Sequence, residues 1–236
     1  MGTKKKLLFV FNPFSGKAQI KNQLLDIVDV MVKADYEVTI YPTQAQGDAI
    51  HKIETEAGDY DLVVCSGGDG TLNEGGSGLM TITPEKRPEL GYIPSGSTND
   101  FASSLGLPKN MRKAAQTAAL GKPFLVDVGV FGKNRYFVYV AAFGAFTEVS
   151  YSTPQETKNI LGHQAYMLEA IKRLTGLKSY RMRLTWEHLG EQRELEEEFI
   201  LGMVTNTTSI GGFKGLVGMD VALDDGEFEV LLVRKP

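Results

Sequence analysis

The sequence predicts an α/β fold with two domains: a doubly wound N-terminal domain and a mostly antiparallel C-terminal domain. In the first half of the chain, apolar strand-like runs alternate with segments of helical period, as in a parallel sheet covered by helices. After about residue 120, most segments are strand-like. The chain has 236 residues and is 42% hydrophobic, so it can bury a sizeable core.

The N-terminal elements follow one another in β-α order. Leu7–Phe11 is a continuous apolar run, as in a strand buried on both faces, and residues 19–34 carry apolar side chains at helical spacing. We predict further strands at 36–42, 60–65 and 89–94, helices at 46–57 and 72–80, and another helix that opens within 95–100.

The change of pattern places a domain boundary near Gly121–Pro123, which gives domains 1–122 and 123–236. In the second domain only residues 158–174 read as a clear helix. Because the sequence stops inside or directly after a strand, we expect that it lacks a C-terminal segment. The strand-like segments of this domain are 125–132, 135–144, 180–188, 196–206 and 228–235.

Composition and charge exclude several classes of protein. The net charge of −4 argues against nucleic acid as the main partner, since proteins that track phosphates usually carry a basic surplus. Cys65 is the single cysteine, so no disulfide can form within the chain, which fits a reducing, cytoplasmic compartment. The N-terminal apolar run Leu7–Phe11 is too short for a signal sequence or a transmembrane segment.

Four polar loops follow the predicted parallel strands: "NPFSGK", "YPTQAQGD", "SGGDGTLNE" and "PSGSTND". In a doubly wound sheet these loops share the edge at which ligands bind. Glycine turns and helix starts present N–H groups to anions, so "GGDGT" can bind phosphates while Asp69 faces Mg²⁺ or an acceptor group. The alternative is a tight strand-to-helix turn in which Asp69 or Thr71 caps a helix.

Two common phosphate-binding motifs are excluded. "NPFSGK" lacks the first glycine of the Walker motif, and Ala18 stands where that motif has Ser or Thr. The first βα turn also lacks the G-x-G-x-x-G pattern of dinucleotide-binding domains.

Five motifs occur in a specific order: "VFNPFSGK", "SGGDGTLNE", "IPSGSTNDFASSLGLP", "DVGVFGKNRYFVYVAAFGAFTEV" and "ALDDGEFEV". Together they resemble the diacylglycerol kinase catalytic family, in its bacterial soluble lipid kinase branch, over nearly the whole chain. "GGDGT" alone is shared with NAD kinases, whereas its combination with "PSGSTNDFASSLGLP" is highly specific.

The resemblance implies a nucleotide-binding α/β domain, a C-terminal β-sandwich and an active site in the cleft between them. It implies Mg-ATP as the phosphoryl donor, a lipid hydroxyl as the acceptor, and Asp69 acting near the transferred group. Carried onto this sequence, the nucleotide contacts are Asn12, Pro13, Phe14, Ser15, Gly16, Thr43, Gly67, Gly68, Asp69, Gly70, Thr71, Leu72, Asn73 and Ser97.

The family also has a metal-binding loop at a "DDG" motif, which makes Asp224 and Asp225 the candidate metal ligands, together with backbone carbonyls. The same letters fit a hairpin turn between strands. The family's general base is a glutamate in a later Asp-Gly-Glu motif. Glu227 is not assigned to that role, because its surroundings match the metal loop. The glycines in "GGSG" (75–78) are a departure from the family that weakens the expected helix by about 1 kcal/mol each.

The expected reaction is phosphorylation of diacylglycerol by ATP to give phosphatidic acid, a step of phospholipid metabolism. Alternatives are another acceptor (a sphingoid base, another lipid or NAD) and a catalytically silent protein that binds nucleotide or lipid. "PSGSTNDF" speaks against NAD. A lipid substrate implies peripheral binding at the inner membrane surface. A homodimer is a further expectation, since it is the commonest soluble oligomer.

Overall fold

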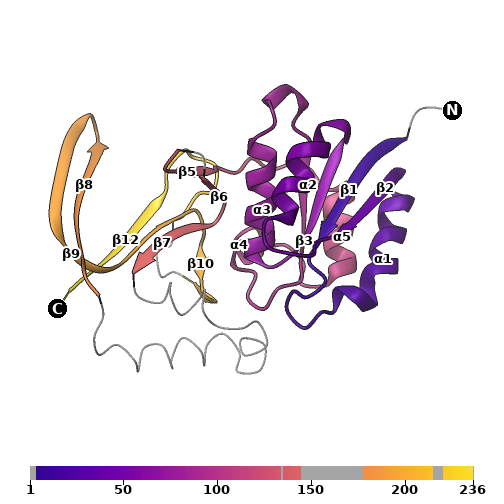
Figure 1. Ribbon diagram of the computed structural model, residues 1–236, viewed down its shortest axis with the longest axis horizontal. Coiled ribbons are helices and arrows are strands. Elements are labelled where there is room, and N and C mark those ends of the chain that lie inside the picture. The colour runs from indigo at the N-terminus through magenta and orange to yellow at the C-terminus, as the bar shows by residue number, and fades with distance from the viewer. Residues whose placement is uncertain (1–3, 134, 145–177, 215–219, 236) are drawn as a thin grey trace. The chain divides into compact units, whose positions relative to one another are not determined.

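The computed structural model of the chain describes residues 4–133, 135–144, 178–214 and 220–235 (Figure 1). The chain divides into two units: unit 1 is Met1–Tyr139 with Asn206–Glu227, and unit 2 is Val140–Thr205 with Phe228–Pro236. This division differs from the expected boundary at 122/123, because side chains between residues 126 and 139 pack on the core of unit 1. The helix expected at 158–174 lies outside the described residues.

Unit 1 is built on a parallel sheet with the strand order β2-β1-β3-β4. The elements predicted for residues 1–122 are found within three residues of their expected bounds, and α5 is an additional helix. The strands are β1 (Lys5–Phe11), β2 (Tyr36–Pro42), β3 (Leu62–Gly67) and β4 (Glu89–Pro94); the helices are α1 (Ile20–Lys33), α2 (Asp48–Glu56), α3 (Asp69–Met80), α4 (Asp100–Ser104) and α5 (Met111–Leu120), with short 3₁₀ turns η1 (Ala57–Asp59) and η2 (Pro84–Lys86).

Different helices cover the two faces of this sheet. On one face, Phe9 packs with Ile27 of α1 and Ala114 of α5. On the other face, Val10 packs with Ile53 of α2 and with α3. Successive residues of β1 therefore point into two separate cores, which explains why this strand is apolar throughout. The doubly wound arrangement predicted from the sequence is confirmed.

The strand order creates a topological switch point between β1 and β3. The chain passes from β1 to β2 on one side and then crosses to β3 on the other. The loops that leave β1 and β3 therefore diverge at this point, and the N–H of Asn12 donates to the carbonyl of Ser66 at 2.9 Å. Ligands of open α/β sheets bind at such a point, outside the carboxyl ends of the strands.

The glycines of α3 are sites of close packing. A Cβ at Gly75 would lie 2.6 Å from Cys65 Sγ on β3, and one at Gly78 would lie 2.9 Å from Ile53 Cβ on α2. A Cβ at Gly76 would lie 2.5 Å from Val138 Cγ2. The helix expected to be weakened by "GGSG" is complete from Asp69 to Met80, because its glycines let three neighbours approach.

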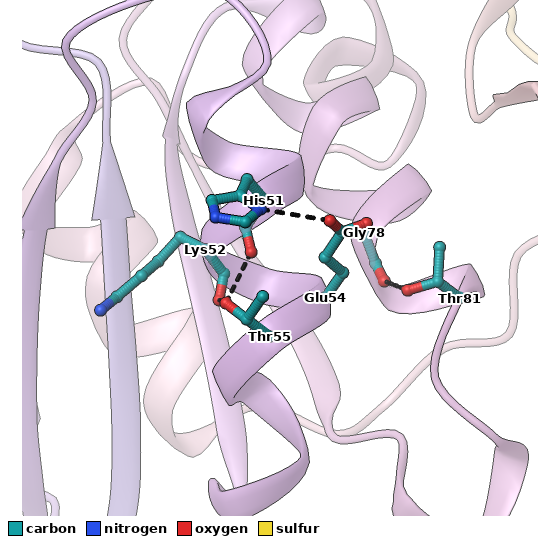
Figure 2. A network of polar contacts seen from close by, with 6 residues as sticks. All are labelled: His51, Lys52, Glu54, Thr55, Gly78 and Thr81. Carbon is teal, nitrogen blue, oxygen red and sulfur yellow. Dashed lines mark hydrogen bonds and ion pairs between the residues drawn. The ribbon is translucent and has the colours of Figure 1, made fainter.

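The region where α2 and α3 meet is shown in Figure 2. Thr81 Oγ1 donates to the carbonyl of Gly78 at 2.7 Å and closes the last turn of α3 (Figure 2). On α2, His51 is exposed and its Nδ1 lies 3.3 Å from Glu54 Oε1, while Thr55 Oγ1 donates to the carbonyl of His51. His51 thus lies on the surface of unit 1.

Unit 2 is antiparallel in its described residues, as predicted, with the order β12-β9-β7 and β8 paired to β9. These strands form one sheet, and a second sandwich layer is not among the described residues. No helix in the described ranges is long and apolar enough to cross a membrane. The strands of unit 2 are β7 (Val140–Gly144), β8 (Tyr180–His188), β9 (Glu191–Thr205) and β12 (Glu229–Arg234); unit 1 adds β5 (Gly129–Phe131), β6 (Arg135–Phe137), β10 (Ser209–Ile210) and β11 (Phe213–Lys214).

Candidate functional site

The loops after β1 and β4 are joined by hydroxyl groups. Ser15 and Ser95 are buried, and their Oγ atoms lie 2.6 Å apart. Ser66 Oγ, at the end of β3, donates to Ser95 Oγ at 3.2 Å. Gly16 has φ +54°, and a Cβ there would overlap the Ser95 carbonyl. The first loop therefore needs glycine both for its backbone conformation and for its contact with the fourth loop.

The loops after β3 and β4 are joined by backbone contacts. The carbonyl of Gly67 accepts the N–H groups of Ser95 (2.8 Å) and Gly96 (3.1 Å) and the hydroxyl of Tyr92 (3.0 Å). A Cβ at Gly96 would overlap the Cα of Gly68. The glycines of "GGDGT" and "SGSTND" thus bring two turns into direct contact.

The second loop is held at the same edge. The N–H of Thr43, which is 8% exposed, donates to the carbonyl of Phe11 at 2.9 Å. The N–H of Gly47 donates to Glu74 Oε1 on α3 at 3.0 Å. All four predicted loops are therefore tied to the carboxyl edge of the parallel sheet.

Asp69 links two of the loops through its carboxylate. Its Oδ2 accepts the N–H of Asp100 and its Oδ1 accepts the N–H of Phe101, each at 3.1 Å. Asp69 therefore caps the N-terminus of α4, a different helix from the one it begins. Burial raises the pKa of Asp69, the two N–H donors oppose this rise, and the negative charge of Asp100 adds to it.

Asp100 is not among the site residues predicted from the sequence, yet it lies at the centre of these contacts. It is 3% exposed, and its carboxylate accepts four hydrogen bonds. Two come from hydroxyls, Tyr139 at 2.9 Å and Ser209 at 2.6 Å, and two from the N–H groups of Gly211 (2.8 Å) and Gly212 (2.9 Å). An acidic residue at the helix start in "STND" was the available signal.

Two predicted nucleotide contacts have side chains engaged within the protein. Leu72 is 3% exposed and belongs to a hydrophobic core. Asn73 Oδ1 accepts the N–H of Val138 at 3.0 Å, which fastens α3 to the segment after β6. Phe14, by contrast, is 63% exposed, and Ser97 is exposed.

The other predicted positions lie where the strand order places them. The first loop holds Asn12, Pro13, Phe14, Ser15 and Gly16; the second holds Thr43; the end of β3 and the first turns of α3 hold Gly67, Gly68, Asp69, Gly70, Thr71, Leu72 and Asn73; and the fourth loop holds Ser97.

The proposed metal ligands lie in another part of unit 1. Asp224 and Asp225 are exposed, and Asp225 Oδ1 accepts the N–H of Glu227 at 3.0 Å, as in a turn. The carboxylate of Asp127 accepts the N–H of Gly226 at 2.6 Å. Among the residues that the structure describes, no group of three or more His, Cys, Asp or Glu side chains could hold a metal ion. A metal role for Asp224 and Asp225 stays a prediction.

The carboxyl edge of the parallel sheet, where the loops after β1, β2, β3 and β4 meet, is called the loop edge below, and it can bind an anionic ligand. Glycine turns and helix N-termini offer N–H groups to phosphate oxygens, and α3 begins at this edge with Asp69, Gly70 and Thr71. Each Asp69 oxygen accepts one N–H bond, so each keeps a second acceptor direction. This donor set fits Mg²⁺, a hard cation that takes oxygen ligands.

The fold and the joined loops at the carboxyl edge of the sheet place the chain in a class of proteins. These are the doubly wound α/β proteins whose ligands bind at the switch point of the sheet. Residues 6–131 match the model of the diacylglycerol kinase catalytic domain. The chain belongs to the diacylglycerol kinase catalytic domain family and is a lipid kinase-type enzyme.

Its relatives match over almost the whole chain. A diacylglycerol kinase of Bacillus subtilis (strain 168) is 35% identical over 98% of this chain and 74% of its own length. One of Staphylococcus aureus (strain bovine RF122 / ET3-1) is 36% identical over 98% of this chain and 71% of its own length. The crystal structure of a diacylglycerol kinase from Bacillus anthracis aligns with a TM-score of 0.76 at 29% identity, and covers 99% of this chain and 75% of that one.

Proposed function

We propose that the protein transfers the γ-phosphoryl group of Mg-ATP to the hydroxyl of diacylglycerol or a related lipid, giving phosphatidic acid and ADP. The observation that carries this proposal is the joining of four loops at one sheet edge, with Asp69 bridging the third and fourth. Family membership supports the reaction type, and the named relatives are diacylglycerol kinases.

The roles of the residues follow from the chemistry of phosphoryl transfer, in which proteins mainly position groups and neutralise charge. The N–H groups of the first loop and of the first turn of α3 hold phosphate oxygens. Mg²⁺, when bound with the nucleotide, neutralises the charge of the phosphates. Asp69 holds that cation at the junction of the loops, and the buried Asp100 fixes the helix start to which Asp69 is bonded.

The acceptor is the least constrained part of the proposal. A sphingoid base, another lipid hydroxyl or NAD would use the same donor site, and a catalytically silent protein would bind nucleotide or lipid without transfer. We place the reaction in the cytoplasm at the inner membrane surface, where a lipid acceptor meets soluble ATP. A homodimer is compatible with this proposal.

The test is transfer of labelled γ-phosphoryl from ATP in the presence of Mg²⁺, run in parallel with ATP binding. Acceptors are diacylglycerol in mixed micelles, a sphingoid base and NAD. Labelled phosphatidic acid is the expected product. If another acceptor carries the label instead, that acceptor is the substrate. ATP binding without any labelled product would indicate a catalytically silent protein. Absence of both ATP binding and product would overturn the proposal.

A further inference from the structure

Asp100 joins two hydrogen-bond systems of the loop edge. Through its carboxylate it accepts the hydroxyl of Tyr139 at 2.9 Å, and through its backbone N–H it donates to Asp69 at 3.1 Å. The neighbouring N–H of Phe101 donates to the other oxygen of Asp69 at 3.1 Å. Asp100 therefore links the phenol of Tyr139, which its side chain binds, to the carboxylate of Asp69, which its own backbone N–H and that of the next residue bind.

Both the backbone and the side chain of Tyr139 are held in place. Its carbonyl accepts the N–H of Asn206 at 3.0 Å, and its side chain packs against the core of Leu72, Tyr92 and Phe101. A side chain held in this way loses little further freedom when its hydroxyl makes a bond. The hydroxyl is therefore a rigid donor to the buried carboxylate of Asp100.

Electrostatics keep this hydroxyl in its donating form. Burial, followed by the negative charges of Asp100 and Asp69, raises the pKa of the Tyr139 phenol well above its usual value. The phenol stays protonated at neutral pH, so it can satisfy part of a carboxylate that is 3% exposed.

We propose that Tyr139 is a positioning residue for phosphoryl transfer: its hydroxyl holds Asp100, and the first turn of α4 held by Asp100 sets the place of the Asp69 carboxylate. This inference rests on the proposed function. Losing the hydroxyl leaves one lone pair of Asp100 without its donor and loosens the two N–H groups that hold Asp69.

The test compares Tyr139→Phe with Tyr60→Phe. The control loses a hydroxyl that donates to Thr39 Oγ1 at 3.1 Å, elsewhere in unit 1. In the proposed lipid kinase reaction, Tyr139→Phe is expected to lower kcat by about 10- to 100-fold with KM for ATP within about twofold. Tyr60→Phe is expected to keep both within about twofold. Equal kcat values for the two variants would overturn the inference and leave the proposed function standing.

A second readout does not need turnover. Exchange of the Asp100 and Phe101 amide hydrogens is expected to be at least about tenfold faster in Tyr139→Phe than in wild type, and unchanged in Tyr60→Phe. Unchanged exchange in Tyr139→Phe would overturn the inference. If wild type phosphorylates no acceptor, the proposed function fails, and the exchange rates still decide whether Tyr139 positions Asp69.

Ser209→Ala tests whether the effect of Tyr139 acts through Asp100. It removes another hydroxyl from Asp100, the donor to Oδ1 at 2.6 Å, and should also lower kcat. In an Asp100→Ala background, Tyr139→Phe should cause less than about a twofold further loss, because the carboxylate that accepts the Tyr139 hydroxyl is already gone. An additive loss in that background would show that Tyr139 acts by another route and would overturn the inference.

Discussion

At the scale of single residues, Asp69 combines two tasks. Its carboxylate ties α3 to α4, and each of its oxygens keeps an acceptor direction that the proposed cation would use. The structural interpretation of "GGDGT" and the chemical one are therefore compatible in one side chain.

Replacing Asp69 by Asn should abolish measurable transfer while the fold persists, since the substitution removes the negative charge on which the proposed Mg²⁺ site depends. The asparagine oxygen keeps one of the two N–H bonds, so the free energy of unfolding at pH 7 should change by only about 1 kcal/mol. Turnover and urea unfolding measure the two effects. Near-normal turnover in Asp69→Asn would show that the catalytic assignment is wrong.

The same pair of proteins gives a pH test. Because burial raises the folded-state pKa of Asp69 above 3.8, its contribution to stability is fully present below that value and is lost as pH rises through the folded pKa. Wild type should therefore gain stability relative to Asp69→Asn on acidification from pH 7. Urea unfolding between pH 4 and 7 measures the difference, and a difference that does not change with pH would contradict the raised pKa.

Asp69 could be found from the sequence, but Asp100 could not be given its role. The glycines around Asp69 are a local signal. Three of the four donors to Asp100 come from Ser209, Gly211 and Gly212, more than a hundred residues away along the chain. Local patterns carry no information on such partners.

At the scale of elements, α3 shows how packing can override helix propensity. Gly78→Ala should destabilise the protein by about 1–2 kcal/mol, because overlap with Ile53 outweighs the usual gain of about 1 kcal/mol for alanine in a helix. The measurement is urea unfolding followed by circular dichroism. Gly58→Ala is the matched control: nothing lies within 4 Å of its Cβ, and it should be neutral or slightly stabilising. A stabilised Gly78→Ala would contradict the close contact of α2 and α3.

Element positions were the most predictable part of the fold. The continuous run Leu7–Phe11 identified β1 because both of its faces are buried. The sequence predicts a start of this helix at Leu72, whereas α3 begins at Asp69, because glycines in the first turn conceal a helix N-terminus. The tolerance of α3 for its internal glycines depends on Cys65 and Ile53, which no local pattern connects to it.

At the scale of the whole molecule, Cys65 reports on the opening of unit 1. It is fully buried in β3, and burial, with the charge of Glu74, raises its pKa to about 12. A thiol reagent should therefore label it only when unit 1 unfolds, and the labelling rate should level off near the ordinary thiol pKa of about 8.5. A rate that instead keeps rising toward pH 12 would show direct attack on the folded state. The same raised pKa means that its stabilising contribution is lost as pH rises above the ordinary value.

The division of the chain was harder to predict than its elements. A change from alternating helices and strands to mostly strands predicts a boundary near residue 122, whereas unit 1 includes residues up to Tyr139 and takes up the chain again at Asn206. Asn206 is fully buried, and its Nδ2 donates to the carbonyls of Asp127 and Leu223 at 3.0 and 3.1 Å. This side chain joins segments that the sequence separates.

The interrupted course of unit 1 sets the order in which it is completed on the ribosome. Synthesis proceeds from the N-terminus at about 5–20 residues per second, and about seventy residues separate Tyr139 from Ser209. For roughly 4 to 14 seconds, the nascent chain has Tyr139 but lacks Ser209, Gly211 and Gly212 as partners of Asp100. The carboxylate of Asp100 therefore lacks three of its four donors until residues 209–212 have been made, so this part of unit 1 is completed only after residues 140–205 of unit 2 have been synthesised.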